Sequence, residues 1–223
     1  MSKLRFIGDV HGRYDLYLPL LSGVDFSIQV GDLGLNYKYL REQEVEWGRH
    51  WAIAGNHDNY GAGEEHFFSQ DFTLERFGAL SVWNKARLFY VGGGWSIDQK
   101  YRTPDVDWWP EEELSTKELS EALSAYRKFK PDILVSHEAP YGCVSHVTDP
   151  AFARRFGFDG AVQTRTSIAL QRMIEHHRPV YSVFGHYHHE GGKIFKLPNR
   201  STTFVHLDMI RPGGTGHYFD IDF

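Results

Sequence analysis

The stretch KLRFIGDVHG, residues 3–12, sets a pattern that the rest of the chain repeats. Residues 3–8 form a short apolar strand that ends abruptly at a Gly-Asp pair, and residues 14–21 then offer the apolar face of a helix. The same order recurs in FSIQVGD at residues 26–32 and in WAIAGNHD at residues 51–58, each followed by a polar stretch compatible with a helix. Strands that alternate with helical segments predict an α/β architecture.

The remainder of the chain continues this alternation of short strands and helices. Ser115 and Glu118 have the spacing of a capping box, which begins a helix that ends before Pro131. A second helix is predicted over about residues 167–177. Further strands are predicted at residues 88–91, 133–135 and 181–184, with half-buried antiparallel strands at 204–207 and 217–223.

Two segments follow no simple period. Residues 95–113 are crowded with aromatic and charged side chains, which predicts an ordered excursion from the core. Residues 141–166 have no clear pattern and are long for a loop. We expect the second segment to be either a lid or a surface wrap.

The composition limits the classes of protein to which the chain can belong. Its 223 residues carry 24 Lys and Arg against 29 Asp and Glu, a net charge of −5, which excludes a general nucleic-acid coat or a polybasic membrane binder. The single cysteine, Cys143, excludes a disulfide framework and a cysteine-based zinc cluster. No apolar run approaches the ~18 residues of a membrane span. We therefore expect one cytoplasmic domain over residues 1–223 that binds no membrane and meets nucleic acid only as a substrate.

Side chains that can bind metals follow the strands at the points where the strands end. They are Asp9, His11, Asp32, Asn56, His57, His137, His186 and His188. In open α/β sheets, ligands bind at the carboxyl ends of the strands. Carboxylate, imidazole and amide oxygen without sulfur suit Mn²⁺, Fe²⁺ or Zn²⁺. One cation cannot take so many groups, and a carboxylate can bridge two, so the set suggests two metals ~3.5–4 Å apart.

Each of these turns has an ordinary alternative explanation when it is taken alone. A Gly-Asp pair after a strand is usually a turn, because Asp bonds its own backbone there. A histidine in a Gly-His-Tyr-His turn is usually a surface residue. Turn chemistry does not explain five such turns at five strand ends, each with a different type of ligand, and we favour the metal site.

The five turns together resemble the motifs of the calcineurin-like metallophosphoesterases. The matching motifs, in the family's order, are Gly8-Asp9-Val10-His11-Gly12, Gly31-Asp32, Gly55-Asn56-His57-Asp58, Ser136-His137 and Gly185-His186-Tyr187-His188. The resemblance spans residues 8–188, nearly all of the chain. It implies two mixed β-sheets packed face to face with helices on their outer faces, a four-layer α/β/β/α fold.

The resemblance also implies a role for each motif residue. One metal would be bound by Asp9, His11 and His188, the other by Asn56, His137 and His186, with Asp32 bridging them. A hydroxide shared by the metals would attack the phosphoester, and His57 would donate a proton to the leaving oxygen or stabilise its charge. Asp58 would either orient His57 or serve the turn. Family habit makes Mn²⁺ the first choice of metal, with Fe, Zn and Ni as alternatives.

The motifs of this chain differ from those of two branches of the family, and the differences limit the possible substrate classes. Phosphoprotein phosphatases grip phosphate with two arginines, but residues 33–36 read Leu-Gly-Leu-Asn and Ala54 stands where the second arginine would be. Purple acid phosphatases bind metal with a Tyr at the place that Leu35 occupies here. Because bidentate arginines are a main source of monoester recognition, we expect a phosphodiester substrate such as a nucleotide or cyclic nucleotide. The alternatives are a phosphomonoesterase or protein phosphatase, and a binding scaffold without activity.

Other side chains are candidates for holding the substrate. Arg13 follows the first motif and could reach a phosphate, although most arginines in such places lie solvated on the surface. Arg102, in the aromatic excursion, is the second candidate. Trp108 and Trp109 could stack on a base, but adjacent tryptophans more often anchor a loop onto the core, and we prefer that interpretation.

Overall fold

The first of two β-sheets contains the N-terminal strands. The computed structural model describes residues 2–82, 86–198 and 201–223. In the first sheet the order is β10-β1-β2-β3, with β1, β2 and β3 parallel and β10 antiparallel to β1. The strands are β1 (Lys3–Ile7), β2 (Phe26–Gln29), β3 (His50–Ala52) and β10 (Tyr218–Asp222). The mixed pairing agrees with the fold class expected from the sequence.

The second sheet holds the remaining described strands, in the order β4-β5-β6-β7-β9-β8. They are β4 (Phe77–Val82), β5 (Ala86–Val91), β6 (Ile133–Ser136), β7 (Tyr181–Phe184), β8 (Lys193–Phe195) and β9 (Thr203–His206). The four inner strands are parallel, and the edge strands β4 and β8 run antiparallel to their neighbours. This sheet is therefore mixed as well.

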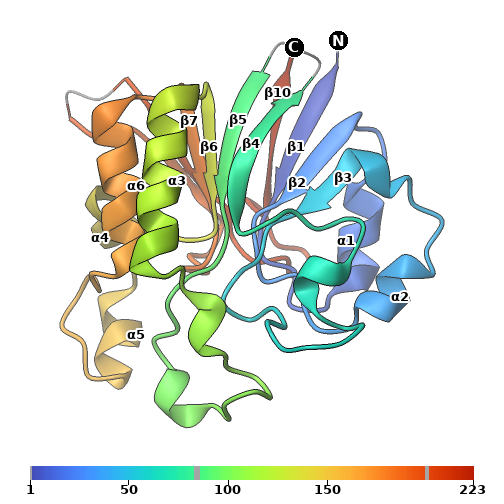
Figure 1. The fold of residues 1–223 in the computed structure, drawn as a ribbon, viewed down its shortest axis with the longest axis horizontal. Coiled ribbons are helices and arrows are strands. Elements are labelled where there is room, and N and C mark those ends of the chain that lie inside the picture. Colours follow the sequence, from blue (N-terminus) through green and yellow to red (C-terminus); the bar gives the residue numbers. More distant parts are fainter. Residues whose placement is uncertain (1, 83–85, 199–200) are drawn as a thin grey trace.

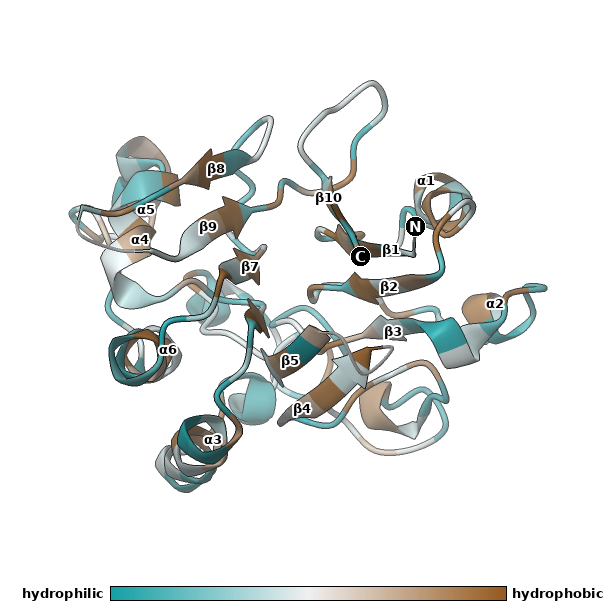
Figure 2. Ribbon diagram, turned by 90° about the horizontal axis from the view of Figure 1, so that it is seen from above, coloured by the Kyte–Doolittle hydropathy of each residue, from teal (hydrophilic) through white to brown (hydrophobic). Residues whose placement is uncertain are grey.

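Helices cover the outer face of each sheet (Figures 1 and 2). On the first sheet lie α1 (Tyr14–Leu20) and α2 (Tyr37–Arg41). On the second lie α3 (Thr116–Phe129), α4 (Tyr141–Val147) and α6 (Arg165–His176). The short α5 (Pro150–Arg155) and the segment between β5 and α3 lie at the end of the molecule away from the marked termini (Figure 1). No helix in the described ranges is both long and apolar enough to cross a membrane.

The hydrophobic core between the sheets holds them face to face. Phe6 and Ile28 of the first sheet pack with Leu88, Val135 and Val183 of the second, and all five are fully buried. Complete burial of such a side chain contributes about 1.5–3 kcal/mol relative to its exposure. Separate cores join the two outer helical layers to their sheets. The four-layer α/β/β/α arrangement expected from the sequence is confirmed.

The helix α3 shows how local sequence sets the bounds of an element. The Ser115 hydroxyl accepts the Glu118 N–H at 3.3 Å, and the Glu118 carboxylate accepts the Ser115 N–H at 2.8 Å. The helix ends at Lys130, which takes a left-handed conformation with φ 54° before Pro131. The predicted capping box and the predicted end of the helix are both confirmed.

One expectation about the strands needs correction, and two further strands were not predicted. The sequence pattern did not indicate β4 or β8, which are edge strands. The strand expected at residues 204–207 is not a half-buried antiparallel strand. As β9, it lies inside the second sheet, parallel to β7 and antiparallel to β8, and three of its four residues are buried. Because β8 pairs with its outer edge, β9 lies inside the sheet and is more buried than the alternating pattern predicted.

Candidate metal centre

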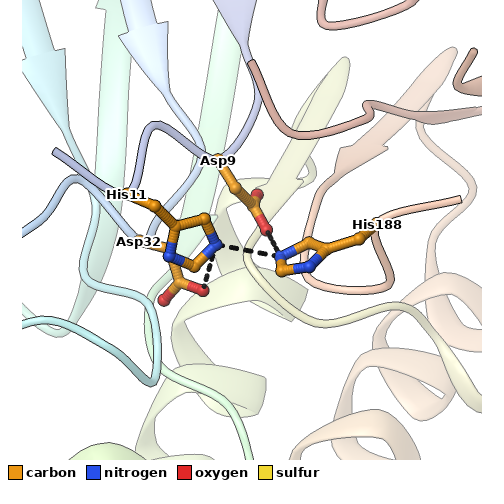
Figure 3. A group of neighbouring side chains, drawn as sticks. All are labelled: Asp9, His11, Asp32 and His188. Carbon is orange, nitrogen blue, oxygen red and sulfur yellow. Dashed lines mark hydrogen bonds and ion pairs between the residues drawn. The ribbon is translucent and has the colours of Figure 1, made fainter. Parts of the chain in front are cut away.

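Four of the predicted ligand residues form a first cluster at the ends of β1, β2 and β7. They are Asp9, His11, Asp32 and His188, whose ligand atoms all lie within 4.8 Å of one another (Figure 3). His188 Nε2 lies 2.9 Å from Asp9 Oδ2 and 3.0 Å from His11 Nε2. The two carboxylates are buried, and the two imidazoles are partly exposed. Such a set of nitrogen and oxygen atoms suits a divalent cation.

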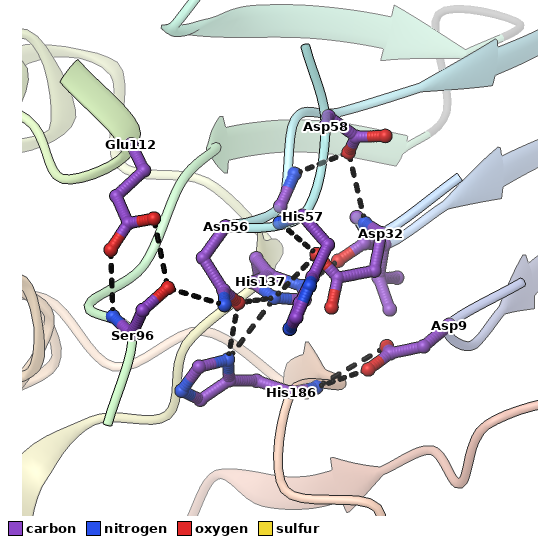
Figure 4. A network of polar contacts seen from close by, with 12 residues as sticks. Asp9, Asp32, Asn56, His57, Asp58, Ser96, Glu112, His137 and His186 are labelled. Carbon is purple, nitrogen blue, oxygen red and sulfur yellow. Dashed lines mark hydrogen bonds and ion pairs between the residues drawn. The ribbon is translucent and has the colours of Figure 1, made fainter. Parts of the chain in front are cut away.

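The other three predicted ligands form a second cluster beside the first (Figure 4). Asn56 Oδ1 lies 2.9 Å from His137 Nε2 and 2.8 Å from His186 Nδ1. The two imidazole nitrogens are 3.2 Å apart. The backbone N–H of His186 also donates to the Asp9 carboxylate of the first cluster, at 3.0 Å to Oδ2. The structure thus brings together all seven residues that the sequence singled out as ligands.

Asp32 lies between the two clusters. Its Oδ2 is 3.5 Å from His11 Nε2 and its Oδ1 is 3.4 Å from His137 Nε2, so each carboxylate oxygen faces a different cluster. Burial raises the pKa of this carboxyl, but attraction to His137, His57 and His11 outweighs burial and leaves the pKa well below its usual value. An ionised carboxylate in this place can share its two oxygens between two cations.

The hydrogen bonds around the second cluster show that lone pairs converge there. His137 Nδ1 lies 2.9 Å from the Val30 carbonyl, which can only accept, so in the neutral ring Nδ1 carries the hydrogen and Nε2 carries a lone pair. Asn56 Nδ2 donates to Ser96 Oγ at 2.9 Å, which directs Asn56 Oδ1 toward the histidines. Two acceptors then face each other at 2.9 Å. A cation between them satisfies both, so the donor set fits a metal.

Ser96 is held in turn by a buried carboxylate. Glu112, only 2 % exposed, accepts the Ser96 N–H and the Ser96 O–H, both at 2.8 Å (Figure 4). Because the hydroxyl hydrogen is used in this way, the Ser96 oxygen is free to accept from Asn56. The hydrogen bonds from Asn56 to Ser96 and from Ser96 to Glu112 therefore fix the orientation of the Asn56 amide, which is a candidate metal ligand.

The backbone at the centre adopts unusual conformations. Four of the seven candidate ligands have positive φ, namely His11 (46°), Asp32 (58°), His186 (73°) and His188 (47°). Such conformations cost of order 1–3 kcal/mol each for residues other than glycine, and they cluster at functional sites. Two glycines of the motifs allow the close packing, because a Cβ on Gly55 would overlap the Asp32 carboxylate and one on Gly185 would overlap that of Asp9.

His57 and Arg102, both predicted to act on the substrate, contact each other. Arg102 donates from Nη2 to His57 Nε2 at 2.5 Å and forms an ion pair with Asp98 at 2.9 Å. The backbone N–H of His57 donates to Asp32 Oδ1 at 2.8 Å. Burial lowers the pKa of His57; Asp32 opposes this effect and Arg102 adds to it. The structure thus places the two side chains as one unit beside the clusters.

Arg13 lies in a different environment. Its guanidinium pairs with Asp15 at 3.1 Å, and its side chain is 42 % exposed. These contacts match the alternative of a solvated surface arginine. The substrate role of Arg13 stays a prediction.

Asp58 makes its contacts with the turns. Its carboxylate accepts the backbone N–H groups of Asp32, Gly55 and Gly34 at 3.0, 2.7 and 3.1 Å, and the Tyr37 hydroxyl at 3.3 Å. Burial, followed by the charge of Asp32, raises the pKa of Asp58 to about 7. Two roles were considered for Asp58, orienting His57 and stabilising the turn. Its described contacts match the second role and include none with the His57 ring.

A cavity of about 260 Å³ opens beside the two clusters. His57, His186 and His188 line one part of it, and α4, α5 and the loop before α6 line another. Residues 141–166, which the sequence did not place, thus supply a wall of the site. Trp109 anchors its loop onto the core, as expected. Its side chain is only 4 % exposed and packs in the core under the first sheet.

Sequence reasoning missed Ser96, Glu112 and Glu138. A signal existed for Ser96, because it follows the three glycines that end β5, and the rule applied to the other strand ends selects it. A weaker signal existed for Glu138, which directly follows His137. Nothing in the local sequence indicates that Glu112 is buried against Ser96.

Comparison with known proteins gives one family match and several similar structures. The family model for calcineurin-like phosphoesterases matches residues 2–190. None of the curated proteins compared with the chain matches it. A dimetal phosphatase from Danio rerio is 13% identical over 93% of this chain and 87% of that chain, with a TM-score of 0.58. A phosphopantetheinyl hydrolase from Mycobacterium tuberculosis is 13% identical over 93% of this chain and 90% of that chain, with a TM-score of 0.54. At this identity the likeness shows the fold alone.

Proposed function

The chain belongs to the calcineurin-like phosphoesterases, a family of hydrolases, and we propose that it hydrolyses phosphodiesters, including nucleotides or cyclic nucleotides, in preference to phosphomonoesters. The products are then an alcohol and a phosphomonoester. The observation that carries the proposed hydrolysis is the position of Asp32, whose two carboxylate oxygens face two separate groups of ligand atoms. The preference for diesters rests on the charges around the site.

In this proposal two divalent cations bind at the two clusters. The first would be held by Asp9, His11 and His188, the second by Asn56, His137 and His186, and Asp32 would contribute to both. When bound, the cations supply Lewis acidity to the phosphoryl group and lower the pKa of a water molecule toward neutrality. We propose Mn²⁺ as the metal, on the family resemblance together with the mixture of carboxylate and imidazole.

His57 and Arg102 act on the phosphoester itself. The His57 ring lies 5.2 Å from the His11 ring, centroid to centroid, which places it at the edge of the first cluster. A neutral His57 is favoured by its lowered pKa. Its Nε2 accepts from the Arg102 guanidinium in the tautomer with the hydrogen on Nδ1, and in the other tautomer Nε2–H can donate to an ester oxygen. Charge that develops on the leaving oxygen is stabilised by this pair of side chains.

The charge balance favours a diester over a monoester. Two arginines of the phosphoprotein phosphatases are missing from residues 33–36 and 54. Arg102 brings one positive charge, but Asp98 lies 2.9 Å from its Nη2 and offsets that charge. A diester carries one negative charge at neutral pH and a monoester carries about two, so the diester needs less compensation.

The test compares p-nitrophenyl phosphate with bis-p-nitrophenyl phosphate on metal-stripped enzyme to which Mn²⁺, Ni²⁺ or Zn²⁺ is restored. We expect faster hydrolysis of the diester, with Mn²⁺ the most effective cation. A clear preference for the monoester would instead mean that Arg102 or another cation replaces the missing arginines. A lack of turnover of both compounds with every metal would favour the scaffold.

A further inference from the structure

The cavity beside the two clusters has a wall that the metal centre does not need. We call it the leaving-group pocket. Its lining residues away from the candidate ligands and His57 include Trp95, Asp98, Glu138, Asp149, Phe152 and Val162. Because His57 lines the same cavity, a group bound there adjoins the side chain proposed to act on the leaving oxygen.

Aromatic side chains form part of the wall. Trp95 packs edge-on against Phe158, with ring centroids 5.4 Å apart. Phe152 on α5 packs against Phe156 at 5.1 Å, and Phe152 is still 47 % exposed. Large aromatic side chains that line a cavity beside polar groups are typical of sites for small organic ligands.

The polar part of the wall is acidic. Asp98 is paired with Arg102, and Asp149 has no ion pair with any described residue. Burial raises the pKa of Glu138 well above its usual value, so its carboxyl group adds no negative charge at neutral pH. No lysine or arginine is among the described residues that line the pocket. An anionic group on the side of the pocket away from the candidate ligands would meet the unpaired carboxylate of Asp149.

Two buried oxygens in this wall lack partners. Glu138 is 2 % exposed; its Oε1 accepts the Thr164 hydroxyl at 2.7 Å, whereas its Oε2 has no hydrogen-bond partner among the described residues. The Thr148 hydroxyl also has no partner in the described part of the chain. Buried polar atoms are rarely left unsatisfied in native proteins. A polar group of a bound ligand is one means of satisfying them.

We propose that the leaving-group pocket receives the alcohol side of the ester, and that this group is an uncharged or cationic body about the size of one aromatic ring, not a further phosphate. The inference rests on the proposed hydrolysis of phosphoesters. A volume of about 260 Å³ lies below the ~300–1,000 Å³ of pockets for drug-sized ligands, which favours a single ring. The lining favours binding of a ring and rejects a second anion.

The test uses two methyl aryl phosphodiesters that differ only by a carboxylate on the ring, methyl 4-nitrophenyl phosphate and methyl 3-carboxy-4-nitrophenyl phosphate. The variant Asp149→Asn removes a pocket charge and keeps a side chain that can accept the Ala151 N–H, as Asp149 does at 2.8 Å. Asp159→Asn, at an exposed position on the loop after α5, is the matched control. For each substrate the ratio of kcat/KM between variant and parent cancels the intrinsic reactivity of the leaving group.

We expect Asp149→Asn to raise kcat/KM for the carboxylate ester by ~3-fold or more relative to the uncharged ester, because like charges no longer meet. Asp159→Asn should change both substrates equally. Phe152→Ala should raise KM for the uncharged aryl ester severalfold without loss of bound metal.

Equal effects of Asp149→Asn on both substrates, together with an unchanged KM in Phe152→Ala, would overturn the pocket while leaving the proposed hydrolysis intact. Absence of turnover of both esters by the metal-loaded parent would overturn the proposed hydrolysis and the pocket with it. Melting temperatures of the variants close to that of the parent show that each is folded.

Discussion

Asn56 owes its orientation to a residue that binds no metal itself. Ser96 accepts a hydrogen from the Asn56 amide, and Glu112 holds Ser96 by two hydrogen bonds. We predict that Ser96→Ala weakens Mn²⁺ binding by about 10-fold, since loss of an outer partner of a metal ligand costs roughly 10–100-fold in affinity. Titration calorimetry measures this change directly.

The matched control is Ser124→Ala. Ser124 is an exposed serine of α3 whose hydroxyl donates to the Ser120 carbonyl, remote from the clusters. Its replacement should leave Mn²⁺ affinity unchanged. Equal affinities for the parent and Ser96→Ala would show that the amide of Asn56 does not need this support.

His57 is the residue on which the proposed chemistry depends most. We predict that His57→Asn retains both metals and loses roughly 10²–10⁴-fold in kcat, the usual contribution of a positioned acid or base. Metal content by elemental analysis and kcat on bis-p-nitrophenyl phosphate separate the two properties. Undiminished turnover in this variant would falsify the role given to His57.

At the residue scale, the sequence predicted positions better than contacts. The seven candidate ligands lie in motifs with fixed spacing, and each follows a strand, so their convergence could be expected. The contact between Arg102 and His57 joins residues 45 positions apart and depends on an irregular loop. No local pattern encodes such a contact. The pairing of Arg13 with Asp15 is local by contrast, and it matches the surface arginine that the sequence left open as an alternative.

At the scale of elements, α3 supplies a clean test of local stability. Ser115→Ala removes the hydroxyl that accepts the Glu118 N–H, and we predict a loss of about 1 kcal/mol in the free energy of unfolding. Ser120→Ala, at an exposed position inside the same helix, should leave stability unchanged or raise it slightly. Urea denaturation of the two variants provides the comparison, and equal losses would mean that the cap is not responsible.

Elements with a strong period were predictable, and short ones were not. The repeated apolar spacing of α3 and α6 extends over 14 and 12 residues, which is long enough to identify a helix. By contrast, α5 has six residues and β8 has three. Their form depends on tertiary contacts such as the pairing of β8 with β9, which sequence periodicity does not report.

At the scale of the whole molecule, a buried histidine makes stability depend on pH. His206 on β9 is 1 % exposed, and neither ring nitrogen has a hydrogen-bond partner among the described residues. Burial lowers its pKa from 6.5 to about 3. Below pH 6.5 the unfolded chain binds a proton that the folded chain refuses, so stability is present above pH 6.5 and falls as the pH drops toward 3.

We predict that His206→Phe removes this part of the pH dependence, up to about 1.4 kcal/mol per pH unit between pH 6.5 and pH 3. The free energy of unfolding of metal-free protein, measured at pH 5 and pH 7.5, checks the prediction. His176→Gln, which replaces an exposed histidine at the end of α6, serves as the control. Parallel pH profiles for His206→Phe and the parent would contradict it.

The order of the sheets and layers was predictable because the motifs resemble those of a family with a known architecture. The placement of residues 141–166 over the site was not. That placement depends on contacts such as Val144 in the core of the second sheet, which are brought together only in the folded chain.

The crowded lone pairs and positive φ angles of the centre have a calorimetric consequence. Ligand groups held close together in the folded chain bind a cation that the unfolded chain does not. Each cation should therefore raise the free energy of unfolding, by about 2.7 kcal/mol at 100 times its Kd, and raise the melting temperature in the order of its affinity. Scanning calorimetry of the metal-free chain with a panel of cations should therefore rank them before any substrate is known. The melting temperature of the protein would then identify the cation that it binds most tightly.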